Sequence, residues 1–148
     1  LLRNKDNYLT LCKDIPISDK NLLFAYILDT NSETLSKLND IANAYGLTLK
    51  FVSAHHDCTL SMEEWLALFR DAKMIITDSF HGTVFSIIFN KEFDTIVNQS
   101  RGRSRFTSLL SQLSLTDRMF NSIFDVNFNS NIIDWSIVND NLSSLKDK

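Results

Sequence analysis

Apolar runs of strand length alternate with helical patterns through the middle of the chain. The segment NLLFAYILD (21–29) carries the first run, and further runs follow at 47–52, 73–77 and 93–97. The segments between them have apolar residues at helical spacing, and the short one over 81–90 is almost entirely apolar, which predicts a buried helix. This alternation predicts an α/β fold, in which a parallel sheet carries helices on both faces.

Polar residues and a glycine mark the helix boundaries. Ser32 precedes the first helical pattern as a candidate N-cap, and Gly46 ends it at the position where a left-handed residue is favoured. Ser61 followed three residues later by Glu64 is a capping box. We therefore expect helices over 32–46 and 61–72.

The C-terminal part of the chain is mainly helical in pattern. A helix is expected over 104–115 and a last one over 132–148, with an apolar face at Ile133, Ile137 and Leu142. No internal repeat, proline-rich linker or low-complexity segment separates parts of the sequence. We interpret residues 1–148 as one α/β domain.

Composition narrows the functional classes. A net charge of −3 and a pI near 5.5 argue against a nucleic-acid partner, so any anion site must be local. No apolar run is long enough to cross a bilayer, and Cys12 and Cys58 form neither a disulfide framework nor a zinc motif. The chain begins with leucine and no signal peptide, so we read it as a fragment of a longer cytoplasmic protein.

The most informative junction lies within MIITDSFHGTVFSIIFN (74–90), where a predicted strand stops and a helical run begins. Ligands of open parallel sheets bind at the carboxyl ends of the strands. A helix that starts near Gly82 or Thr83 offers unpaired N–H groups to an anion, and Gly82 lets that backbone come close. His81 can exchange a proton near neutral pH. The alternative is structural: Asp78 or Ser79 caps the helix, and His81 packs on the sheet edge.

Three arginines follow the fourth predicted strand in the segment SRGRSRF. Arg101, Arg103 and Arg105 are suited to phosphate or carboxylate through paired N–H donors, and a solvated charge run is the alternative. The segment 55–58 contains metal-ligand residue types: His55, His56, Asp57 and Cys58. Adjacent loop residues rarely converge on one ion, so we predict no metal site, and the role of this segment stays open.

These residues resemble a known family. DAKMIITDSFHGTVFSIIFNKEF followed by SRFTSLLSQLSLTDR resembles the C-terminal half of the polysaccharide pyruvyl transferases, and T-D-S-F-H-G is the most specific part. The similarity runs from LLFAYIL to residue 118, and the last helix also resembles the closing helix of the family. The resemblance implies a Rossmann-like lobe on the donor side of a GT-B-like two-domain enzyme, with the N-terminal lobe as a partner outside this chain.

The resemblance also implies a reaction. Phosphoenolpyruvate is the expected donor, without a further cofactor, and a glycan acceptor receives the pyruvyl group as a cyclic ketal during exopolysaccharide or capsule biosynthesis. We expect a cytoplasmic protein at the inner face of the membrane, with peripheral association through a lipid-linked acceptor. The isolated lobe is expected to be inactive, because the acceptor side is missing.

Roles for the junction follow from that reaction. His81 is the candidate general acid or phosphate contact, and Asp78 orients His81 or accepts a hydroxyl proton. The candidate donor-binding residues are Ser79, Phe80, Gly82, Thr83, Arg101, Arg103 and Arg105. Many relatives carry R-x-H-G here, whereas this chain has Ser79 in place of the arginine. Because a hydroxyl cannot replace a guanidinium, either the following arginines compensate or the donor differs.

Two alternatives remain open. The same lobe in a GT-B-type glycosyltransferase would bind a nucleotide-sugar donor and would need a nucleoside pocket. A non-catalytic binding or assembly module of the same fold is the other alternative, and Ser79 is the feature that favours it.

Overall fold

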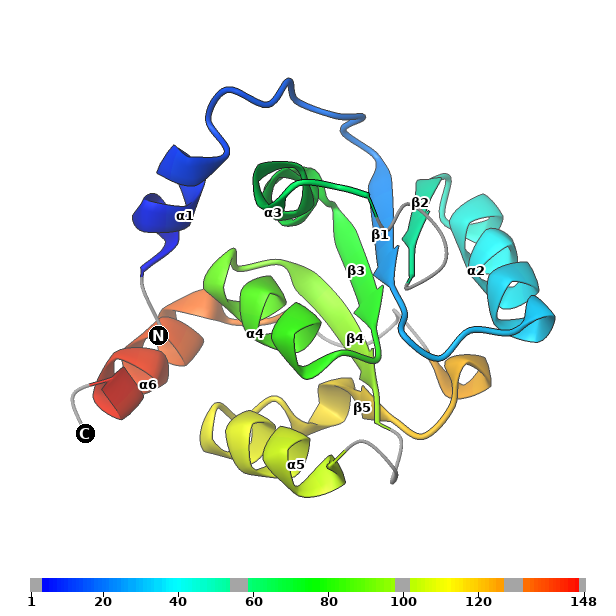
Figure 1. Ribbon diagram of the computed structural model, residues 1–148. Coiled ribbons are helices and arrows are strands. Elements are labelled where there is room, and N and C mark those ends of the chain that lie inside the picture. The colour runs from blue at the N-terminus through cyan, green and yellow to red at the C-terminus, as the bar shows by residue number, and fades with distance from the viewer. Residues whose placement is uncertain (1–3, 54–58, 98–101, 127–131, 147–148) are drawn as a thin grey trace.

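The computed structural model describes residues 4–53, 59–97, 102–126 and 132–146. Five parallel strands form one sheet in the order β2-β1-β3-β4-β5 (Figure 1). The strands are β1 (Leu22–Tyr26), β2 (Thr48–Val52), β3 (Met74–Thr77), β4 (Glu92–Ile96) and β5 (Met119–Phe120). The α/β fold with a parallel sheet is therefore confirmed.

Six α-helices accompany the strands among the described residues: α1 (Lys5–Leu11), α2 (Ser32–Ala44), α3 (Met62–Asp71), α4 (Phe80–Ile88), α5 (Arg103–Gln112) and α6 (Trp135–Lys146). Short 3-10 turns lie at Thr116–Arg118 and Ile123–Asp125. In this described part of the chain, none of the helices has both the length and the apolar character that crossing a bilayer requires.

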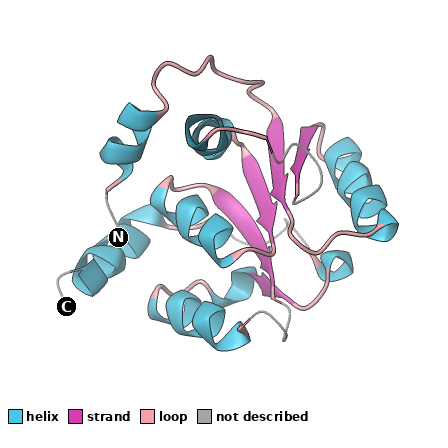
Figure 2. Ribbon diagram, viewed as in Figure 1, coloured by secondary structure: helices cyan, strands magenta, loops and turns pink. Residues whose placement is uncertain are grey.

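Helices cover both faces of the sheet, but unequally (Figure 2). On one face, α2 and the turn at 123–125 pack over a small cluster that includes Leu23 and Ile76. On the other, α1, α3, α4, α5 and α6 pack over a larger cluster that includes Phe24, Ile75 and Phe93. Successive strand residues alternate between the two clusters because strand side chains alternate between sheet faces. Both faces are buried, which explains why the strands read as continuous apolar runs.

The strand order places a crevice between β1 and β3. The chain leaves β1 through α2 to the edge strand β2, and returns through α3 on the opposite face to β3. The loops after β1 and β3 therefore diverge to opposite faces, which defines the switch point where ligands bind in Rossmann-like sheets. The fold positions the T-D-S-F-H-G segment at that point, since it follows β3.

Two predicted helix boundaries are confirmed in detail. Ser61 Oγ accepts the Glu64 N–H at 3.1 Å and the Glu64 carboxylate accepts the Ser61 N–H at 3.1 Å, which completes the capping box. Gly46 adopts a φ of 65° just after the end of α2. This left-handed conformation is the one that glycine adopts without a steric penalty.

Other boundaries differ from prediction. Asn31, not Ser32, is the N-cap of α2, because its side-chain oxygen accepts the Thr34 N–H at 2.9 Å. Ile137 is not part of the buried face of α6: it is 53% exposed, while Val138 and Leu142 are buried four residues apart on the same side. Helix α1 and the two-residue strand β5 were not predicted, since neither carries a periodic pattern long enough to recognise.

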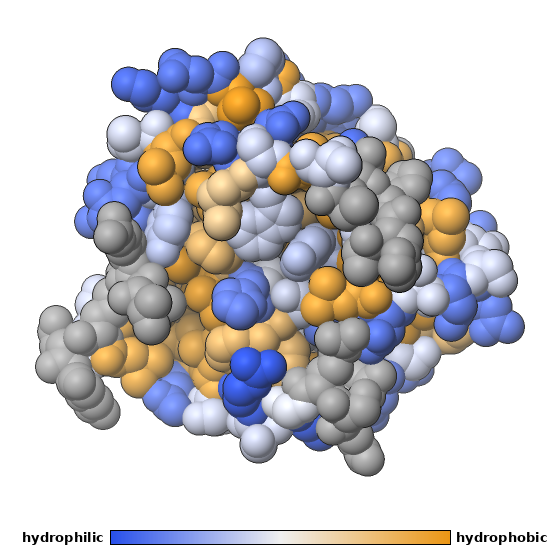
Figure 3. Space-filling model, viewed as in Figure 1, coloured by the Kyte–Doolittle hydropathy of each residue, from blue (hydrophilic) through white to orange (hydrophobic). Residues whose placement is uncertain are grey.

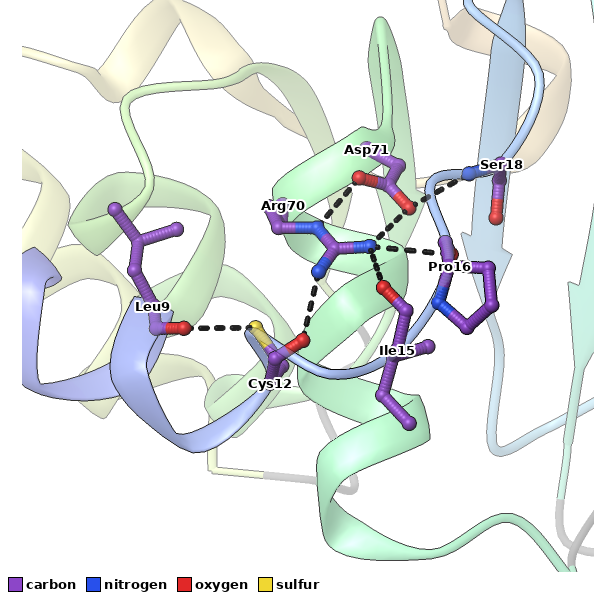
Figure 4. A network of polar contacts seen from close by, with 7 residues as sticks. All are labelled: Leu9, Cys12, Ile15, Pro16, Ser18, Arg70 and Asp71. Carbon is purple, nitrogen blue, oxygen red and sulfur yellow. Dashed lines mark hydrogen bonds and ion pairs between the residues drawn. The ribbon is translucent and has the colours of Figure 1, made fainter.

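The segment after α1 is attached to the end of α3 by an arginine. Arg70 donates hydrogen bonds to backbone carbonyls of residues 12, 15 and 16, and also pairs with the neighbouring Asp71 (Figure 4). Helix α1 also packs on α4, where the Tyr8 ring meets Phe85 edge-on with centroids 4.9 Å apart. These contacts fix α1 over the larger core.

Candidate functional site

A pocket of about 570 Å³ opens at the carboxyl ends of β1, β2 and β3, at the switch point. Its polar lining includes Ser53, Ser61, Ser79 and His81. Its aromatic lining consists of Tyr26, Trp65 and Phe85. The volume lies within the range of small-molecule sites, and the mixture of apolar walls with a few polar groups is typical of them.

Thr77 links the end of β1 to the start of α4. Its hydroxyl donates to the Tyr26 carbonyl at 2.7 Å and accepts the Ser79 N–H at 3.0 Å. The residue is fully buried. The first residue of the T-D-S-F-H-G segment therefore sets the position of α4 relative to the sheet.

Asp78 holds the loop that follows β1. Its carboxylate accepts the N–H of Leu28 at 2.7 Å and the N–H of Asp29 at 3.0 Å, across about fifty residues of sequence. The side chain is buried at 5% exposure. Both carboxylate oxygens are therefore used in holding the backbone of the loop that follows β1. This geometry gives Asp78 a positioning role at the pocket wall.

The helix α4 begins at Phe80, one residue before the helix predicted over 81–90 and ahead of the start expected near Gly82 or Thr83. Ser79 is its N-cap, with the side-chain oxygen accepting the Gly82 N–H at 3.1 Å. The alternative in which Asp78 caps the helix is therefore wrong, since Ser79 occupies that position. The predicted anion contact at the Gly82 N–H is also not available, because the cap already uses that group.

Gly82 and Thr83 lie against the sheet. A Cβ at residue 82 would collide with the Thr77 hydroxyl, so the glycine allows α4 to approach β3. Thr83 is fully buried, and its hydroxyl donates to the Ser79 carbonyl and pairs with the Thr95 hydroxyl, each at 2.9 Å. Both residues fix the helix rather than present donors to the pocket.

His81 is the member of the segment that presents its side chain to solvent. It is exposed in the first turn of α4 and lines the pocket. It also borders a second, largely apolar cavity of about 460 Å³ between α1, α4, α5 and α6. Figure 3 shows apolar residues at the surface over this region. The N–H groups of Phe80 and His81 belong to the first turn, where no intrahelical acceptor exists, and no other described residue accepts them.

The predicted arginines separate in the structure. The guanidinium of Arg105 lies over the Phe80 ring, 4.7 Å from its centroid. Arg103 instead donates to the Asn121 side chain at 2.8 Å, on the loop after β5. Arg101 lies outside the described residues. Of the arginines that the structure describes in this segment, Arg105 is therefore the one beside the start of α4.

The predicted segment 55–58 lies outside the described residues. Within 4–53, 59–97, 102–126 and 132–146, no group of three or more His, Cys, Asp or Glu side chains is arranged to hold a metal ion.

Of the pocket lining, only Ser79 and His81 were predicted as site residues, and two of the others bear on the chemistry of the site. Tyr26 ends β1, and its hydroxyl pKa is raised by burial and by the charge of Asp78, so the phenol stays protonated and able to donate. Trp65 stands edge-on to Tyr26 and to Phe85, with centroids 5.5 and 5.1 Å apart. Its buried indole N–H has no partner among the described residues. The Ser61 capping box was a usable signal, since it places the first turn of α3 at the same sheet edge.

A separate group of charged side chains includes Asp94 on β4, which pairs in register with Ile76 on β3. Ile76 belongs to the cluster under α2, so the group lies on that face of the sheet. Arg118 pairs with Glu92 at 2.9 Å, and its nearest approach to Asp94 is 3.9 Å. Asp94 is fully buried on β4, and burial raises its pKa to about 8 despite the nearby Arg118. None of these three residues lines the pocket, so we assign the group to the fold.

Comparison with known proteins supports the family resemblance. The model of the family described as polysaccharide pyruvyl transferase matches residues 2–100, which include the pocket and the whole T-D-S-F-H-G segment. The match ends before α5, so the similarity over 104–118 and in the last helix is not part of it. No curated protein and no solved structure matches the chain. With two thirds of its length matched, the chain belongs to the polysaccharide pyruvyl transferase family.

Proposed function

We propose that this chain is the donor-side lobe of an enzyme that transfers a pyruvyl group from phosphoenolpyruvate to two hydroxyls of a sugar. The product would be a cyclic pyruvate ketal on an exopolysaccharide or capsular glycan. In this proposal the chain forms the C-terminal half of a GT-B-like pair of lobes, and the N-terminal lobe carries the acceptor across the cleft. Family membership and the pocket at the switch point are the two supports.

The reaction has defined chemical requirements. A general acid protonates the methylene carbon of phosphoenolpyruvate, which turns it into a methyl group and makes C2 electrophilic. One sugar hydroxyl adds to C2 and loses its proton, phosphate leaves with the C2–O bond electrons, and the second hydroxyl closes the ketal. The site therefore needs one proton donor, an acceptor for hydroxyl protons and a set of donors for the phosphate and carboxylate.

The observation that carries the proposal is the position of His81. Its imidazole is exposed at the rim of the pocket and belongs to the first turn of α4, where no described residue accepts the N–H groups of Phe80 and His81. We assign His81 as the general acid and these N–H groups as phosphate donors. Tyr26, kept protonated by its raised pKa, would donate a hydrogen bond to the carboxylate.

Arg105 supplies the positive charge that Ser79 lacks. Ser79 is committed to capping α4, so it holds the phosphate-binding turn in place and makes no charged contact. Arg105 reaches the same turn from α5 through its stacking on Phe80. We assign Arg105 to donor binding, and Asp78 to positioning the loop after β1 rather than to proton transfer.

The cellular setting is part of the proposal. Phosphoenolpyruvate is a cytoplasmic metabolite, so we place the reaction in the cytoplasm at the inner face of the membrane. The acceptor is a glycan carried there on a lipid, and it brings the enzyme to the membrane surface.

A binding experiment tests the donor assignment on the chain itself. Phosphoenolpyruvate should stabilise the chain in a thermal-shift titration, since a ligand that binds only the folded state raises the melting temperature. Arg105→Gln should weaken this binding about tenfold or more, because a charged hydrogen bond to an anion is lost. Arg103→Gln is the matched control, since Arg103 faces Asn121. Equal effects of the two substitutions, or no stabilisation by phosphoenolpyruvate, would contradict the assignment.

Catalysis is tested separately with the complete two-lobed protein. Phosphate release from phosphoenolpyruvate in the presence of candidate acceptors should be lost in His81→Ala, while binding of the donor remains measurable. Release that survives this substitution would rule out His81 as the acid.

A nucleotide-sugar donor is the second candidate, and the aromatic lining of the pocket favours it. Tyr26 and Trp65 provide rings to which a base can stack, and a pocket of about 570 Å³ exceeds what the small phosphoenolpyruvate molecule fills. UDP, GDP and CMP in the same thermal-shift assay separate the candidates. Stabilisation by a nucleotide but not by phosphoenolpyruvate would favour a glycosyltransferase, and stabilisation by neither would favour a non-catalytic module.

A further inference from the structure

Another cleft, distinct from the two cavities beside His81, lies at the edge of the sheet opposite to the candidate site. It has a volume of about 590 Å³ and is formed by segments that precede β1, β3 and β4. Each segment contributes one lysine to the lining: Lys20, Lys73 and Lys91. Because parallel strands all begin at this edge, the fold brings together three residues that are 53 and 18 positions apart in sequence.

Among the charged side chains that line this cleft, the three lysines are those outside the Arg70–Asp71 ion pair. Arg70 and Asp71 also line it, but they pair with each other at 2.6 Å and neutralise one another. Lys20, Lys73 and Lys91 form no ion pair within 4 Å with any described residue. In a chain with a net charge of −3, the described lining of the cleft is therefore a local positive surface, in which Lys91 is half-buried and the one carboxylate, Asp71, is paired with Arg70.

An exposed isoleucine stands at the rim of the same cleft. Ile17 lines it and is 79% exposed, so a large apolar side chain lies at the surface beside the three lysines. The Ile17 side chain does not cover the core. Cys12 and Ile15 on the same segment do so, because they face inward.

The turn that carries Ile17 is held on both sides by the Arg70–Asp71 pair (Figure 4). On one side, Arg70 donates to the carbonyls of Ile15 at 3.0 Å and Pro16 at 3.3 Å. On the other, Asp71 accepts the Ser18 N–H at 2.9 Å. Fixing an apolar side chain outward in this way lowers the entropy cost of inserting it into a partner surface.

Acidic residues of the same loop do not cancel the charge of the cleft. The Asp19 carboxylate accepts the Asn21 N–H and the Thr48 hydroxyl, each at 2.9 Å, which turns it toward β2. Asp14 precedes the turn and is not part of the cleft lining.

We propose that this edge docks the protein onto an anionic lipid membrane, with Ile17 inserted at the interface and Lys20, Lys73 and Lys91 facing lipid phosphates. An apolar side chain surrounded by lysines matches the boundary between acyl chains and anionic headgroups. The inference is independent of the proposed reaction, because it uses none of the pocket residues.

Cosedimentation of the full 148-residue chain with lipid vesicles tests the proposal. Binding is expected to vesicles of phosphatidylcholine mixed with phosphatidylglycerol, to weaken as salt is raised, and to be absent with phosphatidylcholine alone. The Lys20→Gln, Lys73→Gln double variant should bind about thirtyfold more weakly, since each lysine near an anionic surface contributes roughly a factor of five. Ile17→Ser should weaken binding about tenfold.

The control variant also loses two positive charges, but from residues outside the cleft. A Lys37→Gln, Arg103→Gln double variant lacks two cations outside the cleft and should bind vesicles as the unmodified chain does. Ile17, Lys20 and Lys73 are exposed, and Lys37 and Arg103 are only partly buried, so all variants are expected to keep the far-UV circular dichroism of the parent. Equal loss in both double variants, or no binding to anionic vesicles, would overturn the proposal. Vesicle binding that soluble acidic polypeptide displaces completely while Ile17→Ser has no effect would also overturn it, in favour of an acidic protein partner.

Discussion

Gly82→Ala is the substitution that most directly tests how the candidate site is built. A Cβ at residue 82 would collide with the Thr77 hydroxyl, which itself joins the Tyr26 carbonyl to the Ser79 N–H at 2.7 and 3.0 Å. Relief requires either that α4 moves away from β3 or that the Thr77 side chain rotates and gives up these bonds. Both outcomes displace the turn that carries His81.

The cost of the collision in Gly82→Ala exceeds the gain in helix propensity, so the sign of the change in the free energy of unfolding can be predicted. Overpacking of a well-packed contact costs about 1–3 kcal/mol. Each hydrogen bond of Thr77 that is lost adds about 1 kcal/mol. Alanine is favoured over glycine in a helix by up to about 1 kcal/mol, and this gain is smaller in the first turn. We therefore expect Gly82→Ala to lower the free energy of unfolding by ~2 kcal/mol, which corresponds to a melting temperature lower by ~4–8 °C.

Urea denaturation of a double-mutant cycle isolates the contact. In a Thr77→Ala background the colliding hydroxyl is gone, so Gly82→Ala should become nearly neutral, with a coupling energy of about 1–2 kcal/mol. Gly46→Ala is the matched control, because Gly46 has a φ of 65° and no atom of a described residue lies within 4 Å of an added Cβ. Its backbone penalty of about 1 kcal/mol should be the same in both backgrounds.

A Gly82→Ala variant that is as stable as the parent chain, or that loses the same free energy with and without the Thr77 hydroxyl, would refute the predicted collision. In the first case α4 adjusts without cost, and in the second the loss comes from the helix itself. Binding of phosphoenolpyruvate should fall in Gly82→Ala if the first turn of α4 forms the anion site.

Three further predictions concern groups that the fold buries. Asp94 has a pKa of about 8 in the native state against 3.8 when unfolded, so between these pH values only the native state holds the proton, and the free energy of unfolding falls as pH rises. Asp94→Asn should remove this pH dependence in urea denaturation, and an unchanged pH dependence would contradict the prediction. Asp78→Ala leaves two backbone N–H groups without their acceptor and should cost about 2–4 kcal/mol by chemical denaturation, whereas a loss under 1 kcal/mol would show that water replaces the carboxylate. Arg70→Lys should raise the hydrogen-exchange rate of the Ser18 amide, because one ammonium group cannot bridge three carbonyls and Asp71. An unchanged exchange rate would show that other contacts hold this segment.

Much of the fold was predictable because its signals are local. The buried strands appear as short apolar runs, and the capping box of Ser61 and Glu64 specifies the start of α3. Errors occurred where two local signals compete, as at Asn31 and Ser32, both of which are good N-caps. The face of α6 was misjudged because Ile137 and Val138 are adjacent, and only contacts with the core decide which of them is buried.

The candidate site was located from the sequence, but the roles within it were not. The junction after β3 was predicted to lie at the ligand edge, and the pocket is there. The partners of Thr77 and Asp78 come from the end of β1 and from the loop after it, about fifty residues away, and no local pattern contains them. The same holds for Tyr26, which reads as one more residue of an apolar strand until the sheet places it beside the start of α4.

By itself the sequence determined the α/β class, the parallel sheet, the family and the region of the candidate site. Those properties depend on periodicity, capping residues and a specific motif, all of which are readable along the chain. Tertiary structure decided that Gly82 serves close packing, that Arg105 rather than Arg103 reaches the start of α4, and that Ile17 is held outward. Each of these depends on residues that only the strand order brings together, because the loops of a parallel sheet gather at its edges from distant parts of the chain.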